Sequence, residues 1–468
     1  MQYSRPGGNF FVGDCMPFAH DGVFHLYYLL DEAHHALRGG LGGHQWAHLS
    51  TTDLVCWTQH PLALALGQDW EASLCTGSIL HYREKYHAFY PTRTWQKTEC
   101  LSHASGPDGI SFAKTLPNPF LSAPAGYAPA DFRDPFAYIG DDGRVNLLVT
   151  ARLEAPSLAG LGGCIVRFTS QDLAHWDFQG PILFPGSRKG HLSVPECPDY
   201  FAFNGRQYLT FGQGLRTYYR ISSDGGASWS RPLIDTLGNN MLAVMKTASF
   251  GDGRRIGVAW IGSRDGGRDD GNRLWGGHLV FREIVPLRDG SLGTKFPAEM
   301  VPDTGRQVGA HLASLTPGAV IDAGNVTFRA PATIEAASLA ELPRDYRLRC
   351  TFTPQRGAYR FGLGLRGEGA FDTMYLLSVS GTTGNVRLGD EEIEGVYEDG
   401  QPIEFDIVLH DDIIDVCINE SHCLINRLGN LQGGSAFLFC EGGCATVSGI
   451  ASTYVKRNEE FGLPVGMS

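Results

Sequence analysis

The hydrophobic positions of the chain gather in short runs, and five of these runs follow one another at a nearly regular interval. They read GVFHLYYLLD from Gly22, EKYHAFYPTR from Glu84, GRVNLLVTAR from Gly143, GRQYLTFGQG from Gly205 and GRRIGVAWIGS from Gly253. Their starts are 62, 59, 62 and 48 residues apart, the period of a unit of about four strands. The pattern predicts a five-bladed β-propeller, in which the first strand of each blade runs along a central channel.

A second repeat lies out of phase with the first. An Asp is followed four or five residues later by an aromatic residue in the segments TTDLVCW, SGPDGISF, SQDLAHW and SSDGGASW, whose aspartates are Asp53, Asp108, Asp172 and Asp224. Asp is an ordinary turn residue because its side chain bonds to nearby backbone N–H groups. We therefore expect these aspartates to shape hairpins between strands and not to act in chemistry.

Three further carboxylates share one phase of the first repeat. Asp14 lies eight residues before Gly22, Asp134 lies nine before Gly143, and Glu196 lies nine before Gly205. Equivalent strands of a cyclic repeat converge, so these acids from three blades are predicted to point into one pocket. The alternative, that all three are solvated loop residues, does not account for their common phase.

The repeat ends near residue 300, and a different pattern follows. Five segments alternate between apolar and polar residues, which is typical of a half-buried antiparallel sheet; they are 346–354, 359–366, 373–380, 403–410 and 413–420. We predict an all-β chain with a propeller over residues 1–305 and a C-terminal β-sandwich over residues 315–460. Two domains also suit a length of 468 residues.

Charge and composition remove several classes of function. A net charge of −12 argues against nucleic acid as a partner, because phosphate binding needs a basic face. No run approaches about 18 apolar residues, and the N-terminus lacks a leader pattern, so neither a membrane nor a secreted protein is expected. Eleven cysteines without the density of a disulfide scaffold favour reduced thiols and a cytoplasmic location. The oligomeric state cannot be read from the chain.

His44 and His48 are four residues apart and could suggest metal ligands. No third ligand stands at a recognisable spacing, so ordinary strand or turn histidines are favoured and no metal is predicted.

Three segments resemble the signature segments of glycoside hydrolase family 32, the invertase, inulinase and levanase group. They are GDCMPF around Asp14, FRDPF around Asp134 and VPECPDYF around Glu196, in the order and with the spacing typical of the family. CTGSIL at 75–80 and HQWAHLSTTDLVCWTQHPLAL from His44 also resemble family segments, so the likeness covers nearly the whole chain.

The resemblance implies a retaining glycosidase that needs no cofactor and acts on a β-fructofuranoside. Asp14 would be the nucleophile, Glu196 the general acid and base, and Asp134 the residue that binds ring hydroxyls as the transition state develops. Arg133 would orient a neighbouring carboxylate and lower its pKa. Cys197 would either tune Glu196 or serve as a small packing residue beside it. Thr76 and Ser78, within the CTGSIL segment, are further predicted substrate contacts.

Departures from the family pattern limit what can be said of the substrate. Gly13 precedes Asp14 where the family has Asn, and the family's Gln falls on Leu29 or Leu30, so two sugar-binding groups are lost. Near the fifth repeat the segment NNMLAVMKTA places Lys246 on the predicted channel strand. Three tryptophans are candidates for stacking on sugar faces, with ordinary packing between blades as the alternative; they are Trp46, Trp70 and Trp275.

Three alternatives remain open at the level of sequence. The glycosyl-enzyme could pass its sugar to another sugar hydroxyl, giving a transferred or cyclic difructose. The substrate could be another furanoside, such as an arabinofuranoside. The chain could also be a silent carbohydrate-binding propeller, although the three intact acids argue against this. The reaction of a furanoside panel, with identified products, would separate them.

Overall fold

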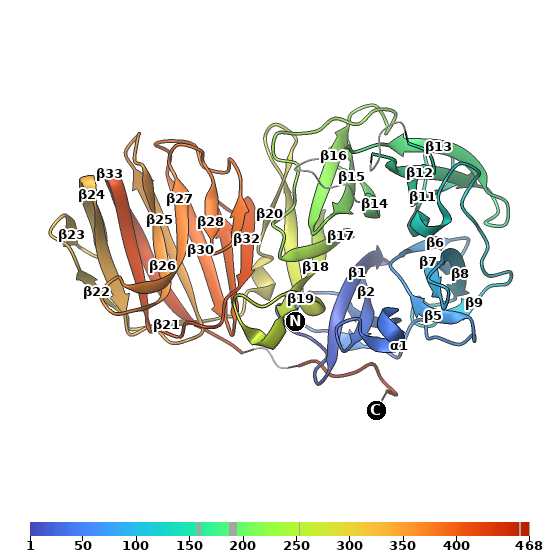
Figure 1. Cartoon of the computed structure of the whole chain (residues 1–468), viewed down its shortest axis with the longest axis horizontal. Helices are drawn as coiled ribbons and strands as arrows, with labels where there is room; N and C mark the ends of the chain where they lie inside the picture. Colours follow the sequence, from blue (N-terminus) through green and yellow to red (C-terminus); the bar gives the residue numbers. More distant parts are fainter. Residues whose placement is uncertain (157–160, 187–193, 252, 458–459, 468) are drawn as a thin grey trace.

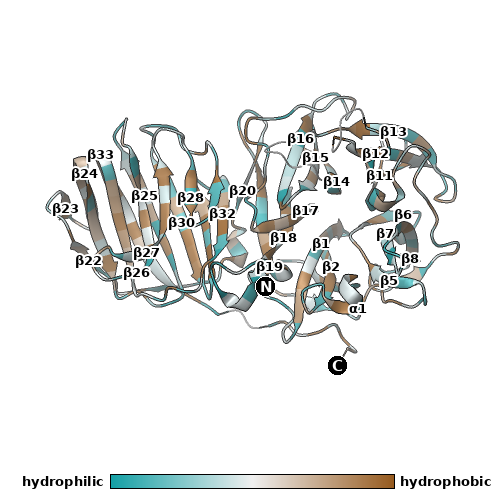
Figure 2. Ribbon diagram, in the orientation of Figure 1, coloured by the Kyte–Doolittle hydropathy of each residue, from teal (hydrophilic) through white to brown (hydrophobic). Residues whose placement is uncertain are grey.

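The computed structural model describes residues 1–156, 161–186, 194–251, 253–457 and 460–467. Small sheets surround a central axis in the first part of the chain, and a larger β-structure lies beside them (Figure 1). Figure 2 shows apolar stretches on the strands of both parts. No helix in the described residues has the length and apolarity needed to cross a membrane.

Five blades account for the first part, which confirms the predicted propeller. Blade 1 contains β1 (Phe10–His20), β2 (Val23–Glu32), α1 (Leu37–Gly40), β3 (Gln45–Thr51) and β4 (Thr58–Gln59). Blade 2 contains β5 (Glu71–Leu74), β6 (Ser78–Tyr82), β7 (Lys85–Thr94), β8 (Glu99–Gly106) and β9 (Ala113–Lys114). Blade 3 contains η1 (Pro129–Asp131), β10 (Arg133–Ile139), β11 (Val145–Arg152), β12 (Gly163–Ser170) and β13 (Asp177–Leu183).

The last two blades complete the ring. Blade 4 contains β14 (Glu196–Phe203), β15 (Arg206–Gln213) and β16 (Arg216–Ser222). Blade 5 contains β17 (Leu242–Phe250), β18 (Arg254–Arg264), η2 (Asp265–Gly267), β19 (Arg273–Pro286), β20 (Leu292–Lys295) and η3 (Ala298–Met300). Pairing of Val12 in β1 with Gly277 in β19 joins blade 5 to blade 1. The five predicted apolar runs are the strands that pair with the inner strand of each blade; they are β2, β7, β11, β15 and β18.

The turn aspartates act as the sequence predicts. Asp53 Oδ1 accepts hydrogen bonds from the N–H groups of Val55 and Cys56 at 2.9 and 2.7 Å. These backbone bonds lower the pKa of Asp53 because they favour the charged carboxylate. Asp172 accepts the equivalent pair of bonds in blade 3. These residues are therefore parts of the hairpins.

The second part is an antiparallel β-sandwich, as predicted. Its strands are β21 (Asp303–Gln307), β22 (His311–Ser314), β23 (Ala319–Asp322), β24 (Asn325–Ala340), β25 (Tyr346–Pro354), β26 (Arg360–Glu368), β27 (Thr373–Ser380), β28 (Val386–Leu388), β29 (Glu391–Ile393), β30 (Ile403–His410), β31 (Ile413–Ile418), β32 (His422–Arg427) and β33 (Ser435–Val455). The long strand β33 pairs with β26 through its first half and with β25 through its second half, so it links the two layers. Strands of the sandwich sheet begin at Asp303; the division at 305 and 315 stays a prediction.

Alternation places the core of the sandwich. In β25 and β27 nearly every second residue is buried, and these residues join one large apolar cluster. After β33 the chain returns to blade 1, where the Phe461 and Val465 N–H groups donate to the carbonyl oxygens of Arg5 and His60 (Figure 1). The C-terminal segment is thus held against the propeller.

A fully buried ion pair joins the two parts. Arg282 of β19 donates to both carboxylate oxygens of Asp415 of β31 at 2.8 Å, and Tyr3 Oη donates to the same carboxylate. Both charged side chains have no exposed surface. Each charge is therefore neutralised only by groups inside the contact between propeller and sandwich.

Replacing Asp415 by Ala should lower the free energy of unfolding by about 3 to 5 kcal/mol, because Arg282 is left charged and buried. Urea denaturation followed by tryptophan fluorescence measures the change. The matched control is Asp270→Ala, which breaks an exposed pair with Arg268 and should cost less than about 1 kcal/mol. Equal losses in the two variants would contradict the role of the buried pair.

Candidate active site

A β-bulge interrupts the inner strand of four blades near the centre of the ring. The pairing register shifts between Val12 and Cys15 in β1, between Arg133 and Phe136 in β10, between Glu196 and Asp199 in β14, and between Ala243 and Lys246 in β17. A bulge bends its strand and re-aims a side chain. The ends of the inner strands can therefore turn their side chains into one shared space.

The three predicted acids occupy successive positions of this bulge. Glu196 is the last paired residue before it, Asp134 is its first residue, and Asp14 is its second residue. Asp134 has a φ of 53°, and Cys197, at the matching position of blade 4, has a φ of 52°. Such left-handed backbone is uncommon for residues other than glycine and often marks functional sites. The sequence repeat predicted one common position for the three acids. In the structure their positions relative to the bulge differ by one residue from blade to blade.

One cavity of about 270 Å³ collects these side chains. Asp14, Asp134 and Glu196 all line it, as predicted for acids from three blades. Of the predicted substrate contacts, four line it as well: Thr76, Arg133, Cys197 and Trp275.

Asp14 is held through both of its oxygens. Thr76 Oγ1 donates to Oδ2 at 2.5 Å, and Trp260 Nε1 donates to Oδ1 at 2.9 Å. Only 8% of the surface of Asp14 is exposed. Two donors from different blades thus fix the plane of a carboxylate that still reaches the cavity.

Gly13 explains one departure from the family pattern. A Cβ atom at this position would lie 2.2 Å from the indole ring of Trp275. Trp275 therefore occupies the space that a larger residue before Asp14 would need. Leu29 also lines the cavity, so an apolar side chain stands in the wall where the family's Gln is expected.

Asp134 and Cys197 are in direct contact, and Cys197 also lies beside Asp14. The Cys197 N–H donates to Asp134 Oδ2 at 3.1 Å, and its Sγ lies 3.5 Å from this oxygen and 3.8 Å from Asp14 Oδ2. Burial, together with the charges of Asp134 and Asp14, raises the pKa of the thiol well above its usual value. Cys197 is thus a neutral donor beside Asp14 and Asp134. Its effect on Glu196, its neighbour in the chain, stays a prediction.

Asp134 itself is almost fully buried. Burial, together with the carboxylates of Glu196, Glu99 and Asp14, raises its pKa to about 7 against the opposing effect of Arg133. Asp134 therefore exchanges a proton near neutral pH.

Arg133 orients Glu196. Its Nη2 and Nε atoms donate to Glu196 Oε1 at 2.8 and 3.3 Å, and its Nη1 pairs with Asp131 at 2.9 Å. Neighbouring carboxylates raise the pKa of the Arg133 guanidinium against the effect of its burial. The predicted role of Arg133 as an orienting residue is consistent with this geometry.

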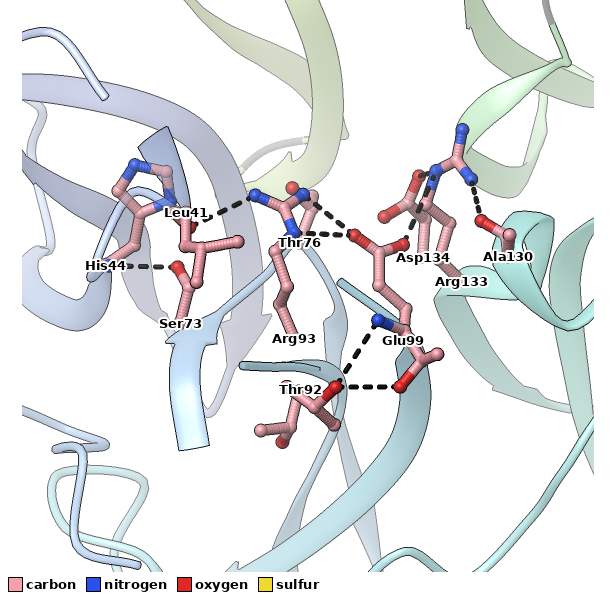
Figure 3. A network of polar contacts seen from close by, with 12 residues as sticks. Leu41, His44, Ser73, Thr76, Thr92, Arg93, Glu99, Ala130, Arg133 and Asp134 are labelled. Carbon is pink, nitrogen blue, oxygen red and sulfur yellow. Dashed lines mark hydrogen bonds and ion pairs between the residues drawn. The ribbon is translucent and has the colours of Figure 1, made fainter. Parts of the chain in front are cut away.

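Glu99 connects Arg133 to a second arginine, Arg93. The repeat did not predict a role for Glu99 or for Arg93. The Glu99 carboxylate lies between the guanidinium groups of Arg93 and Arg133 (Figure 3). Arg93 donates to Glu99 Oε1 at 2.7 and 3.0 Å, and Arg133 Nε lies 3.8 Å from Glu99 Oε2. Glu99 begins β8, outside the inner strands, so the repeat gave no signal for it. Trp260 lies within the fifth repeat run, on β18, which is not an inner strand. The repeat therefore predicted its strand but not its contact with Asp14.

Four predicted substrate contacts are not supported. Trp46 is fully buried in the propeller core, where its Nε1 donates to the Cys75 carbonyl. Ser78 is buried between blades, donates to the Pro135 carbonyl and accepts from the Ala137 N–H. The polar groups of both side chains are therefore already bonded inside the propeller and do not face the acidic cavity.

Lys246 and Trp70 are also absent from the described residues that line the acidic cavity, although Lys246 is close enough to Asp134 and Asp14 to interact with their charges. Lys246 is 2% exposed, and its Nζ donates to the Gly77 carbonyl at 2.9 Å. It lines a separate cavity with Phe136, and burial lowers its pKa. Trp70 precedes β5 and is absent from the described residues that line the acidic cavity.

The histidines near this cavity have different partners. His48 bonds to His25 at 3.0 Å inside blade 1. His44 stacks on Trp275 with a ring separation of 4.4 Å and lines the cavity with His35. Burial, with His44 and Arg93 close by, lowers the pKa of His35 to about 4.

The structure thus combines a five-bladed propeller, with three carboxylates lining one cavity, and a companion β-sandwich. The family model described as "Glycosyl hydrolases family 32 N-terminal domain" matches residues 15–292, so the chain belongs to this family. The chain is also 26% identical over 297 residues to a sucrose-6-phosphate hydrolase of Pediococcus pentosaceus, covering 58% of this chain and 56% of the relative. The chain spans about half the length of the curated relatives it matches.

Solved structures share the whole fold. A fructan 1-exohydrolase IIa of Cichorium intybus matches with a TM-score of 0.74 and 17% identity, covering 98% of both chains. A sucrose-6-phosphate hydrolase of Lactobacillus gasseri matches with a TM-score of 0.72 and 15% identity, covering 97% of this chain and 93% of the other. At these identities the likeness speaks for the fold.

The raised pKa of Asp134 predicts a pH-dependent stability. Folded Asp134 titrates at about 7 and an ordinary aspartate at 3.8, so the folded protein binds an extra proton between these values. The resulting stabilisation is present below about pH 4 and is lost as the pH rises through 7.

Replacing Asp134 by Asn removes this titration. The free energy of unfolding of the variant, relative to the wild type, should rise by an amount on the order of a few kcal/mol between about pH 4 and pH 8. Urea denaturation of both proteins at a series of pH values measures it. A difference that stays constant with pH would show that Asp134 does not titrate in this range.

Proposed function

We propose that this chain is a retaining hydrolase of β-fructofuranosides. The observation that carries the proposal is the convergence of Asp14, Asp134 and Glu196, three carboxylates from three blades, on one cavity. Membership of a glycoside hydrolase family and relatives named for hydrolysis of sucrose-6-phosphate support it. The cavity suits a single furanose ring better than a long chain segment, because its volume is about 270 Å³.

In the first step, an oxygen of Asp14 attacks the anomeric carbon and forms a glycosyl ester, while the bond from that carbon to the glycosidic oxygen breaks. Glu196 gives its proton to the departing oxygen. Thr76 and Trp260 keep the Asp14 carboxylate oriented for the attack. Arg133 contacts one oxygen of Glu196, which leaves the other available for the proton transfer.

In the second step, Glu196 takes a proton from water, whose oxygen bonds to the anomeric carbon as the ester to Asp14 breaks. Inversion at each step returns the starting configuration. Asp134 binds ring hydroxyls, and hydrogen bonds that strengthen as positive charge develops on the sugar lower the barrier.

Asp14→Ala should lower turnover by roughly 10⁴-fold or more, because the nucleophile is lost. The matched control is Asp177→Ala, which removes an exposed aspartate of β13 and should keep wild-type turnover. Added azide should restore product as a fructosyl azide of inverted configuration, since a small anion can enter the vacated space. Near-normal turnover by a folded Asp14→Ala variant would remove Asp14 from the mechanism.

Glu196→Gln should affect the two steps differently according to the leaving group. Substrates with an alkoxide leaving group should slow by about 10²- to 10⁴-fold, the usual contribution of general acid catalysis. An activated aryl fructofuranoside needs little protonation, so its first step should stay faster than its second, and stopped-flow absorbance should record a burst of phenol. Equal slowing of both substrate types without a burst would mean that Glu196 serves only to bind sugar.

A further inference from the structure

Three potential metal ligands meet at the edge of the acidic cavity. Asp31 lies near the end of β2, His35 lies in the turn that follows, and His44 directly precedes β3. One ligand atom from each lies within 4.8 Å of the other two. His44 Nε2 is 3.0 Å from Asp31 Oδ1 and 3.2 Å from His35 Nδ1. Asp31 and His44 are buried, whereas His35 is partly exposed.

Protons alone satisfy this arrangement poorly. A carboxylate only accepts hydrogen bonds, and one ring nitrogen carries at most one proton. If His44 Nε2 carries a proton, that proton can point fully at only one of its two neighbours. If it carries none, its lone pair faces the lone pairs of Asp31 Oδ1. Three lone-pair atoms therefore crowd around one point with too few protons between them.

Asp31 provides a second, independent observation. The side chain has no exposed surface, so bulk water cannot reach its Oδ2 atom. This oxygen has no hydrogen-bond partner among the described residues. Buried carboxylate oxygens are normally paired, and an orphaned one needs an explanation such as a bound ion. Asp31 Oδ1 already accepts from the His35 N–H at 2.8 Å, which fixes the turn that carries the first histidine.

We propose that Asp31, His35 and His44 bind one divalent transition-metal ion of the zinc class. Two imidazole nitrogens and one carboxylate form a common ligand set for this class, with bonds of about 2.0 to 2.2 Å. Tetrahedral bonds of that length separate neighbouring ligand atoms by roughly 3.3 to 3.6 Å. The observed contacts of 3.0 and 3.2 Å need only small side-chain shifts to reach this spacing.

The remaining coordination position opens toward the proposed sugar site. His35 and His44 both line the cavity that holds Asp14 and Glu196. A bound ion would thus present its fourth position, held by water or a sugar hydroxyl, to the same space.

Arg93 is a positively charged side chain that would lie close to a bound metal ion. Its Nη1 lies 3.4 Å from His35 Nε2, a nitrogen that would carry a proton once Nδ1 binds metal. That weak contact must lengthen on binding. Arg93 keeps its bonds to Glu99 and to the Leu41 carbonyl, so its charge remains paired.

The binding test uses the full chain after treatment with a chelator, with ZnCl₂ titrated by calorimetry and CoCl₂ followed by visible absorption. We expect one ion per chain and intense tetrahedral cobalt bands. His35→Gln should weaken zinc binding at least tenfold and abolish those bands, since it removes one ligand. Asp31→Asn is the second variant, and thermal denaturation without metal reports whether either variant is folded.

The matched control is His81→Gln, which removes a partly exposed histidine that stacks on His20 in another part of the propeller. It should leave the zinc affinity unchanged. Equal zinc affinity in the wild type and in folded His35→Gln, or absence of zinc binding by the wild type, would overturn the proposal. These readouts need no turnover, so their failure would leave the proposed hydrolase function untouched.

Discussion

The centre of this molecule depends on holding several carboxylates together in a buried space. Like charges at short range raise the free energy of the ionised state, and burial adds to that cost. The structure offsets both effects with Arg133 between Glu196 and Asp131, with Arg93 on Glu99, and with neutral donors on Asp14. Asp134 accepts from a backbone N–H and a thiol and lies 3.9 Å from Arg133 Nε, yet it is the acid whose pKa burial raises to about 7 against the effect of Arg133.

The closed ring of blades makes this arrangement possible. Acids that are 120 and 62 residues apart in sequence reach one cavity because each lies at the bulge of an inner strand. The Arg282–Asp415 pair then fixes the sandwich against blade 5 at the edge of the same ring. The three acids lie on strands, so their relative positions do not depend on the conformation of a loop.

The periodicity of the sequence predicted the strands and the blades, because both follow from regular backbone geometry. The five apolar runs and the alternating segments of the sandwich were predicted from sequence because strands repeat every two residues and blades repeat every fifty or sixty. Two of the sandwich strands, Tyr346–Pro354 and Ile403–His410, begin and end where the pattern predicted. The acids followed from their shared phase in the same repeat.

Side-chain partners outside the repeat could not be predicted in this way. Glu99 reaches the cavity from β8, a strand that carries no repeat signal, and Trp260 reaches it from a repeat strand that is not an inner strand. Trp46 was predicted to stack on a sugar, yet it is buried in the core of the propeller. The pairing of His44 with Asp31 and His35 depends on a turn whose path the spacing does not define. Local patterns find strands, whereas such contacts follow only from the three-dimensional packing of several blades.

The central claim is that Asp14 bonds covalently to the sugar during turnover. Peptide mass spectrometry of the Glu196→Gln protein, quenched in acid during reaction with an activated aryl fructofuranoside, tests it directly. The account predicts a peptide containing Asp14 that is heavier by one anhydrohexose unit, with fragmentation placing the sugar on Asp14. A sugar bound to a different residue, or unmodified Asp14 during steady turnover, would contradict it.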